Sequence, residues 1–343
     1  MRRVIHHTVA QTYEYLYVDR LDEFAALLAH HYAEARDDTK STEYAIRAGN
    51  LALHANAQPE ARLHYAQALD ALSRLPDDDQ NRRWRLDALL NQMWVATFSE
   101  PPAVQLERLD EAEALARSLP ETDSAVQRQV AQIYHFKGFM HLITNRPREA
   151  LHYFNAARTL SQTLGDERVQ AIATASIGLQ LSFQGRFSAA EPFIRDDIDL
   201  MRRAGVPLDQ VSAVSTLGWI VAAQGNYAAG QAEAEQGILL AQQAHNPSAI
   251  EVGYSLLAEI YWMGRDIPHM LEASRACLAM AEANHDIVWM NIGYYYVAWA
   301  QSYLGQHEEA LANRTRAGYW RDPEGPVVST RLVDRRRGRD RME

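Results

Sequence analysis

Two pairs of adjacent histidines are the side chains of this chain that could most readily hold a metal ion. The pairs are His6-His7 and His30-His31. Successive residues on a helix point about 100° apart, so neither pair can direct both imidazoles at one ion from one face. The sequence contains no H-E-x-x-H motif, no pair of cysteines and no EF-hand spacing. We therefore expect no metal site and interpret the histidines as surface or packing residues.

The other reactive side chains do not form a catalytic set. The single cysteine, Cys277, falls where a small buried residue is expected. The adjacent acids Asp196-Asp197 and Glu308-Glu309 fit solvated helix faces or first-turn partners of a helix dipole better than a paired acid and base. No Walker A motif and no Gly-rich dinucleotide loop occurs. We predict that the chain has no catalytic residues, binds no cofactor and is not an enzyme.

The overall composition is that of a folded intracellular protein with an acidic balance. The 343-residue chain is 47% hydrophobic and 23% charged, with a formal net charge of −10. This balance argues against nucleic acid as the main partner, because phosphate binding needs a basic face. A single cysteine excludes an internal disulfide and suits a reducing cytosol. No segment has signal-peptide or membrane-spanning character, so we expect a cytoplasmic protein without a membrane partner.

The chain repeats itself every 40 residues. Gly138, Gly178 and Gly218 stand at this spacing, and Ala258 and Ala298 continue it. A second series keeps the same step and marks turns: Asn145, Gly185, Gly225 and Gly305, with Gly264 one residue early. A fixed period of about 20 to 50 residues is typical of stacked supersecondary units.

Each period has the pattern of two helices joined by a short turn. Apolar residues at helical spacing lead to a polar or Gly-containing turn, and the next helix opens with acidic residues or proline. Gly138 inside a helix is worth about 1 kcal/mol less than alanine, which is best explained by close approach of a partner helix. Ala150 and Ala157 offer the matching small surface, with Phe154 between them. The sequence predicts an all-α fold, an α-solenoid of stacked antiparallel helix pairs.

This pattern resembles the tetratricopeptide repeat (TPR). The resemblance rests on a Gly or Ala in the first helix, a glycine turn, and small–aromatic–small positions in the second helix, and it covers about residues 43–319. It is weaker at Met270 and Asp197, which replace small residues, and in the degenerate unit 82–119. The resemblance implies a TPR-like right-handed superhelix whose first helices line the concave side.

The N-terminal stretch does not follow the period. Residues 20–23 (RLDE) and 28–32 (LAHHY), followed by Tyr44 and residues 48–49 (AG), resemble the segment that joins the ATPase core to the repeats in bacterial signal-transduction (STAND/AAA-type) ATPases. This resemblance implies that the chain is the C-terminal TPR arm of such a protein. The missing Walker A motif means that ATP hydrolysis is not implied with it.

We expect three parts along the chain. Residues 1–40 form an N-terminal helical linker or cap, residues 41–320 a TPR-like helical repeat domain of about seven helix pairs, and residues 321–343 a disordered basic tail. The tail loses the period and carries an excess of arginine. Weak contact of its arginine segment 331–341 with nucleic acid is the one exception to the expectation that nucleic acid is not a partner.

The period also predicts which side chains face the concave groove. With the Gly/Ala series as a phase marker, large aromatic residues gather on the inner side of the first helices, with one charge among them. The predicted groove residues are His135, Phe139, Phe183, Trp219, Glu259, Trp262, Tyr295, Trp299 and Tyr303. An aromatic groove with few polar groups suits capture of a peptide or small ligand. The alternative is that these rings only pack between helices.

Two functions remain open at this point. One is a non-catalytic TPR scaffold that mediates protein–protein interaction, with a peptide or a subunit, through its concave groove in regulatory signalling. The other is a small-molecule-sensing arm of a signal-transduction ATPase or transcriptional regulator, whose partner would be a small-molecule effector.

Overall fold

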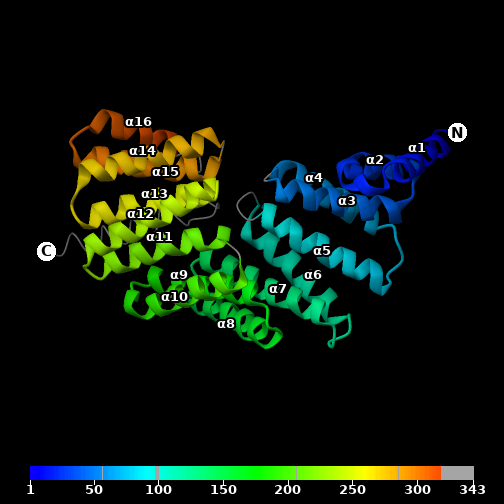
Figure 1. Cartoon of the computed structure of the whole chain (residues 1–343), viewed down its shortest axis with the longest axis horizontal. Helices are drawn as coiled ribbons and strands as arrows, with labels where there is room; N and C mark the ends of the chain where they lie inside the picture. The colour runs from blue at the N-terminus through cyan, green and yellow to red at the C-terminus, as the bar shows by residue number, and fades with distance from the viewer. Residues whose placement is uncertain (56, 97–99, 206, 285, 318–343) are drawn as a thin grey trace. The chain divides into compact units, whose positions relative to one another are not determined.

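The computed structural model of the chain describes residues 1–55, 57–96, 100–205, 207–284 and 286–317. Within these residues all regular secondary structure is helical (Figure 1). The helices are α1 (Arg2–Leu16), the 3-10 helix η1 (Val18–Phe24), α2 (Ala25–Ala35), α3 (Asp38–His54), α4 (Gln58–Leu72), α5 (Asp79–Ala96), α6 (Pro102–Arg117), α7 (Ser124–Ile143), α8 (Pro147–Leu164), α9 (Glu167–Phe183), α10 (Phe187–Ala204), α11 (Pro207–Ala223), α12 (Tyr227–Gln243), α13 (Pro247–Met263), α14 (Ile267–Ala283), α15 (Ile287–Tyr303) and α16 (His307–Ala317).

The chain divides into two compact units. The first comprises Met1–Met140 and the second His141–Glu343, so the boundary falls within α7. α1, η1 and α2 precede α3 in the first unit. The expected boundaries at residues 40 and 320 stay predictions, and the expected tail, residues 321–343, lies outside the described residues.

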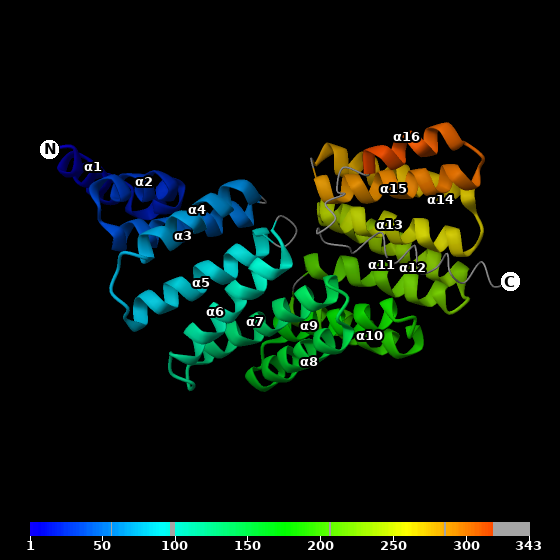
Figure 2. The ribbon, with the colours of Figure 1, turned by 180° about the vertical axis from the view of Figure 1, so that it is seen from behind.

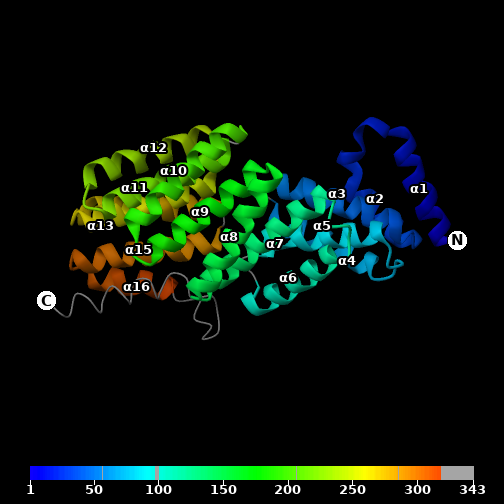
Figure 3. The ribbon, with the colours of Figure 1, turned by 90° about the horizontal axis from the view of Figure 1, so that it is seen from below.

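Consecutive helices of the second unit pack against each other as pairs. α9 packs on α10, α11 on α12, α13 on α14 and α15 on α16, and each pair packs on the next. Seen from behind and from below, the helices of this unit lie side by side along the stack (Figures 2 and 3). In the first unit α3 packs on α4 and α5 on α6. The prediction of an all-α fold built from stacked antiparallel helix pairs is confirmed.

The turns within the helix pairs share one backbone conformation at a fixed step. Left-handed residues, with φ between 58° and 98°, recur every 40 positions: Asn145, Gly185, Gly225, Arg265 and Gly305. The turns between pairs repeat it half a period away: Gly165, Gly205 and His245. Glycine is favoured at most of these positions because it has no Cβ to clash in the left-handed region.

The interpretation of Gly264 as the turn marker of its unit is wrong. Gly264 has an ordinary φ of −76°, and the left-handed position belongs to Arg265 with φ 62°. The backbone period therefore continues without interruption through this unit, although the glycine is displaced by one residue. Glu259 and Trp262, which lie just before this turn, keep the phase that the sequence assigns to them.

We expect Arg265→Gly to stabilise the protein by about 1 kcal/mol. A left-handed conformation costs a residue with a Cβ about 1–2 kcal/mol, and the greater freedom of glycine in the unfolded chain offsets part of the gain. The measurement is the urea midpoint of unfolding. Gly185→Arg, at the equivalent turn with φ 76°, is the reverse control and should destabilise. A less stable Arg265→Gly protein would contradict this account.

Asp and Asn side chains begin many of the helices that follow these turns. Each accepts a hydrogen bond from a backbone N–H in the first turn, which satisfies one of the donors left without a partner at a helix start. The capping residues are Asp37, Asp166, Asn226, Asn246, Asp266 and Asp286. All but Asp286 directly follow a left-handed residue, and the residue before Asp286 lies outside the described ranges. A left-handed residue followed by an acidic or amide cap is thus a recurrent joint of the fold, found at five turns, whereas Arg146 and Arg186 follow a left-handed residue without a side-chain cap.

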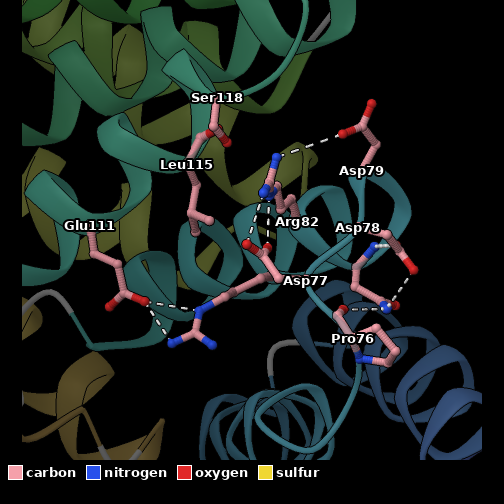
Figure 4. Close-up of polar contacts among 10 residues, drawn as sticks. Pro76, Asp77, Asp78, Asp79, Arg82, Glu111, Leu115 and Ser118 are labelled. Carbon is pink, nitrogen blue, oxygen red and sulfur yellow. Dashed lines mark hydrogen bonds and ion pairs between the residues drawn. The ribbon is translucent and has the colours of Figure 1, made fainter.

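The loop between α4 and α5 shows the same cap with ion pairs added (Figure 4). The Asp78 carboxylate accepts a hydrogen bond at 2.9 Å from a backbone N–H in the first turn of α5. Arg82 donates to both carboxylate oxygens of Asp77, at 2.7 and 2.8 Å. Arg85 donates to Glu111 at 2.9 Å and so ties α5 to α6. These contacts fix the start of α5. Because the ion pairs are exposed to solvent, each adds little to the free energy of unfolding.

One position of the second helices α8, α10 and α14 is closed to solvent. Ala157, Asp197 and Cys277 stand at this position, 40 residues or a multiple of 40 apart, and are 0%, 2% and 0% exposed. Burial raises the pKa of the Cys277 thiol to about 12, as befits a small packing residue. The expectation that Asp197 is solvated is wrong, because its place in the series turns it inward. Glu308 and Glu309 are exposed in the first turn of α16.

The two histidine pairs meet in the first unit, where α1 packs on α2. His6 Nδ1 and His31 Nδ1 lie 2.8 Å apart, so one ring donates a hydrogen bond to the other. His7 lies edge-on against Tyr32 at a centroid distance of 5.8 Å, and His30 is exposed. The described part of the chain contains no group of three or more side chains suited to a metal ion. It also contains no helix with the length and apolarity needed to cross a membrane.

Candidate functional site

The first helices of the second unit carry most of the predicted groove residues. α11 packs directly on α13 and α13 on α15, whereas no two second helices in the described part of the unit make contacts as extensive. A stack whose first helices lie closer together than its second helices curves toward the first helices. We call the surface formed by α11, α13 and α15 the first-helix face.

Glu259 lies at the centre of the first-helix face, on α13, and is held from both neighbouring helices. Its Oε2 accepts a hydrogen bond from Trp219 Nε1 of α11 at 2.9 Å, and its Oε1 accepts one from the Tyr296 hydroxyl of α15. Trp219 and Glu259 occupy the same place in consecutive periods, so the 40-residue step sets them side by side. These two hydrogen bonds hold the half-buried carboxylate in place between the neighbouring helices.

Trp219 stabilises the first-helix face from inside the stack and contributes little exposed surface to it. Its indole is 3% exposed. It packs against Phe183 and Phe187 with centroid distances of 6.4 and 5.5 Å, both T-shaped. The residue therefore aims and anchors the Glu259 carboxylate from inside the stack, and Phe183 and Phe187 fix the indole in turn.

Five aromatic side chains of α13 and α15 form a contiguous aromatic cluster beside Glu259: Trp262, Tyr295, Tyr296, Trp299 and Tyr303. The Trp262 and Trp299 rings lie 4.8 Å apart. Trp299 also contacts the other three rings, at 6.4, 6.0 and 6.5 Å. The Trp262 indole N–H donates to the Tyr303 hydroxyl at 3.4 Å. Four of the five rings are half-buried and Tyr303 is 54% exposed. The rings therefore pack against one another and also leave part of their aromatic surface exposed to solvent.

The two remaining predicted groove residues, His135 and Phe139, lie on α7 in the first unit. His135 is 8% exposed, and its ring stacks on that of Trp94 at a centroid distance of 6.4 Å. Burial lowers the pKa of His135 to about 4, so the ring is neutral at pH 7. Phe139 is half-buried. The structure thus gathers six of the nine predicted residues around Glu259 or in the aromatic cluster, with Phe183 behind Trp219.

Two residues that shape the site are absent from the sequence prediction, Tyr296 and Phe187. Tyr296 lies three residues before Trp299 on α15, so helical spacing places both on one side of the helix. That spacing could have identified it. Phe187 opens the second helix α10 after the turn at Gly185, where the sequence suggests only an aromatic that fills the turn. Its contact with Trp219 depends on how α10 packs on α11.

Comparisons with known proteins place the fold but not a family. No protein-family model matches the chain, and no curated protein matches it. Among solved structures, the Rap conjugation gene regulator of plasmid pLS20 in complex with a Phr peptide has a TM-score of 0.65 at 14% identity, covering 84% of this chain and 75% of that chain.

Two further solved structures are similar over most of the chain. NprR in complex with its cognate peptide NprX has a TM-score of 0.60 at 12% identity, covering 87% of this chain and 84% of that chain. Aspartyl phosphate phosphatase F from Bacillus subtilis has a TM-score of 0.62 at 14% identity, covering 91% of this chain and 79% of that chain. Likeness at such low identity shows the fold alone. The chain has a TPR-like helical-repeat fold, as its sequence predicts.

Proposed function

We propose that this chain is a non-catalytic scaffold that binds a peptide, or an extended segment of another protein, on the first-helix face. The observation that carries the proposal is one fixed carboxylate, Glu259, bordered by a partly exposed cluster of five aromatic rings on consecutive first helices. Aromatic side chains supply much of the binding energy at protein interfaces. A regulatory setting is part of the proposal.

The surface is organised before any partner arrives, which favours binding over catalysis. Trp219 and Tyr296 hold the Glu259 carboxylate, and Trp299 contacts every other ring of the cluster. Side chains that are already ordered lose little entropy on binding, so more of the contact energy appears as affinity. The aromatic cluster and Glu259 offer a single carboxylate, with neither a thiol nor an imidazole to act as its nucleophilic or basic partner.

The similar structures support a peptide as the partner. The plasmid pLS20 regulator and NprR are both solved with a bound peptide. A third similar structure is that of a protein named as a phosphatase. Its 14% identity shows a shared fold and gives no ground for assigning its activity to this chain. An extended peptide also suits a row of parallel helices, because helix axes about 8–10 Å apart let successive helices contact peptide residues about three positions apart.

The test is a selection of random heptapeptides displayed on mRNA against the immobilised full chain, followed by fluorescence polarisation with the enriched sequences. We expect peptides whose affinity falls about tenfold or more in Trp299→Ala, since loss of a central aromatic contact costs at least about 1.4 kcal/mol. Leu311→Ala is the matched control, because Leu311 on the second helix α16 is 66% exposed and lies off the first-helix face.

Two outcomes would contradict the proposal. One is a set of selected peptides that bind Trp299→Ala and Leu311→Ala as tightly as the parent chain. The other is an empty selection combined with a Trp299-dependent rise in melting temperature on adding sugars or nucleotides, which would assign the surface to a small molecule. Circular dichroism of both variants shows whether the helices remain intact.

A further inference from the structure

The N-terminal helix α1 meets α2 through a pair of facing histidines, His6 and His31. We propose that this pair makes the first two turns of α1, residues 2–9, a proton-released segment that is docked on α2 at neutral pH and detached in mild acid. The segment lies within the first unit, and its release does not require peptide binding on the first-helix face. Three features support it: the small apolar contact of α1, the geometry of the histidine pair and the charges around that pair.

α1 buries little apolar surface against the rest of the first unit. Ala10 is the one buried residue of this fully described helix, and Tyr13 is partly buried in the same cluster. Val4 and Ile5, in the first two turns, are 68% and 53% exposed. A helix of 15 residues is marginal in water by itself. Whether the first two turns stay docked therefore depends on their polar contacts.

The last turns of α1 are anchored by Glu14, whose contacts persist in mild acid. Its carboxylate accepts hydrogen bonds from the Tyr32 hydroxyl at 2.6 Å, from the Lys40 ammonium at 3.2 Å and from the Tyr44 hydroxyl. Burial acts to raise the pKa of Glu14, but these hydrogen bonds outweigh it and hold the pKa below 4.5. Glu14 therefore stays charged at about pH 5, and only the first two turns respond.

The histidine pair can hold at most one extra proton while the segment is docked. The Nδ1 atoms of His6 and His31 lie 2.8 Å apart, so one nitrogen carries a hydrogen and the other accepts it through its lone pair. A first proton can bind the far nitrogen of the donor ring without breaking this bond. A second must bind the acceptor nitrogen, which sets two N–H groups against each other and two cations at a ring-centroid distance of 5.0 Å. Separated rings each take up a proton in acid, so docking excludes one proton.

The neighbouring charges oppose protonation of the pair. The His30 ring lies 6.1 Å from that of His6 and 5.5 Å from that of His31, and it adds a positive charge in acid. Burial, followed by His6 and His30, lowers the pKa of His31 from 6.5. Most other charged groups on α1, η1, α2 and α3 are paired or exposed: Glu34 pairs with Arg2, Glu14 and Glu43 with Lys40, Asp22 with Arg47, Glu23 with Arg20 and Asp38 with Arg74, while Asp19, Arg3, Arg36 and His54 are exposed.

His7 acts in the opposite direction, but its effect is small. Protonated His7 would face the Asp37 carboxylate, 3.9 Å away, and attract it. The two side chains are 41% and 30% exposed, and an exposed ion pair contributes little to docking. Asp37 is also engaged as the cap of α3, where it accepts a hydrogen bond from the Lys40 backbone N–H at 3.0 Å. The histidine pair therefore decides the sign.

The direction of the pH effect follows from this proton count. In acid the docked segment binds fewer protons than the detached one, so docking is complete above about pH 6.5 and weakens as the pH falls below that value. Each excluded proton weakens docking by up to about tenfold per pH unit, because one pKa unit is a factor of about ten in the equilibrium constant.

Hydrogen exchange of the backbone amides tests the release on the full parent chain. The reporters are the amides of residues 5–9, and those of residues 13–16, beside the Glu14 anchor, and of α4 are internal references. After correction for the intrinsic exchange rate at each pH, protection at residues 5–9 should fall by about tenfold between about pH 6 and pH 5, while the references keep theirs. Unchanged protection at pH 5, or no protection at pH 7, would overturn the proposal.

A double variant isolates the histidine pair. In His6→Gln/His31→Gln the two amides can still hydrogen-bond to each other and cannot take up a proton, so residues 5–9 should stay protected at pH 5. His54→Gln removes an exposed histidine at the end of α3 and should behave like the parent chain. An acid-induced loss that persists in the double variant would overturn the proposal, because another group would then be responsible.

The ring signals of the parent chain decide the matter if the double variant does not dock at pH 7. The measurement is the Cε1–H shift of His31 in protein with ¹³C-labelled histidine, followed from about pH 7.5 to about pH 4.5. We expect the ring of His31 to become protonated over the same pH range in which residues 5–9 lose protection. A His31 ring that is fully protonated while those residues remain protected would overturn the proposal.

Discussion

Gly218→Ala should destabilise the second unit by about 3 kcal/mol or more. A Cβ at position 218 would lie 2.5 Å from the Gly230 carbonyl oxygen and 2.6 Å from the Ala234 backbone nitrogen. Both atoms belong to the backbone of α12, so no side-chain rotation relieves the clash and α11 must move away from α12. Overpacking a close helix contact typically costs about 1–3 kcal/mol, and a clash with backbone belongs at or beyond the upper end.

Two other glycines make this prediction specific. At Gly178 an added Cβ would meet the Ile194 Cδ1 atom at 2.6 Å, the far end of a side chain that can rotate, so Gly178→Ala should cost clearly less. At Gly264 the nearest atom would be the Ile260 carbonyl oxygen at an ordinary 3.5 Å, so Gly264→Ala should be neutral or slightly stabilising. Urea unfolding followed by circular dichroism gives all three values. Equal losses at 218 and 178 would refute the assigned packing.

The second large effect is a loss of stability with rising pH that Glu251→Gln should remove. Glu251 on α13 is 1% exposed, and its Oε1 accepts a hydrogen bond from Asn284 Nδ2 at 3.0 Å. Its Oε2 has no hydrogen-bond partner within the described ranges. Burial is the main cause that raises the pKa of Glu251 from 4.5 to about 7; the Asn284 bond opposes it, and the nearby Asp286 carboxylate adds to it.

The direction of the pH effect follows from the two pKa values. Below about pH 4.5 the carboxyl is protonated in the folded and unfolded protein alike, so its titration does not affect stability. Between about 4.5 and 7 the folded state binds more protons than the unfolded state, and the free energy of unfolding falls as the pH rises. Above about pH 7 the loss is complete and amounts to about 3 kcal/mol, because one pKa unit corresponds to about 1.4 kcal/mol.

Glu251→Gln should match the parent chain near pH 4.5 and exceed its stability by up to about 3 kcal/mol at pH 8. Glutamine copies the protonated acid in shape and cannot ionise. The measurement is the free energy of unfolding in urea across this pH range. Glu272→Gln removes an exposed acid on α14 and serves as the control. Parallel profiles for the parent and Glu251→Gln would show that Glu251 titrates normally in the folded state.

The sequence predicts the repeat well because the residues that mark the 40-residue period are ones whose small size or backbone freedom the fold requires. Gly178 and Gly218 stand where a partner helix comes too close for a Cβ, and Gly185 and Gly225 where φ is positive. Such positions tolerate few residue types, so they remain visible in the sequence. Arg265 shows the limit, since a single non-glycine residue can take the left-handed position and hide the turn.

Exposure and charge state were harder to predict, because they depend on neighbours that the period does not specify. Trp219 and Trp299 hold equivalent places in their units, yet Trp219 is buried under Phe187 while Trp299 is half-exposed. Glu251 looks in the sequence like any surface acid, and only the packing of α13 against α14 buries it. The repeat pattern predicts on which side of its helix a side chain lies. How far that side chain is buried depends on how the neighbouring helix packs against it.

The recurrent joint of a left-handed residue and an Asp or Asn cap makes the array modular. The residues that set each change of direction lie within a few positions of one another, so a bend does not depend on distant parts of the chain. Contacts in the stack likewise join segments near in sequence, which lets folding begin in any pair and spread to its neighbours. A whole 40-residue block can therefore be gained or lost between equivalent joints, and the length of the recognition surface can change without redesigning the turns.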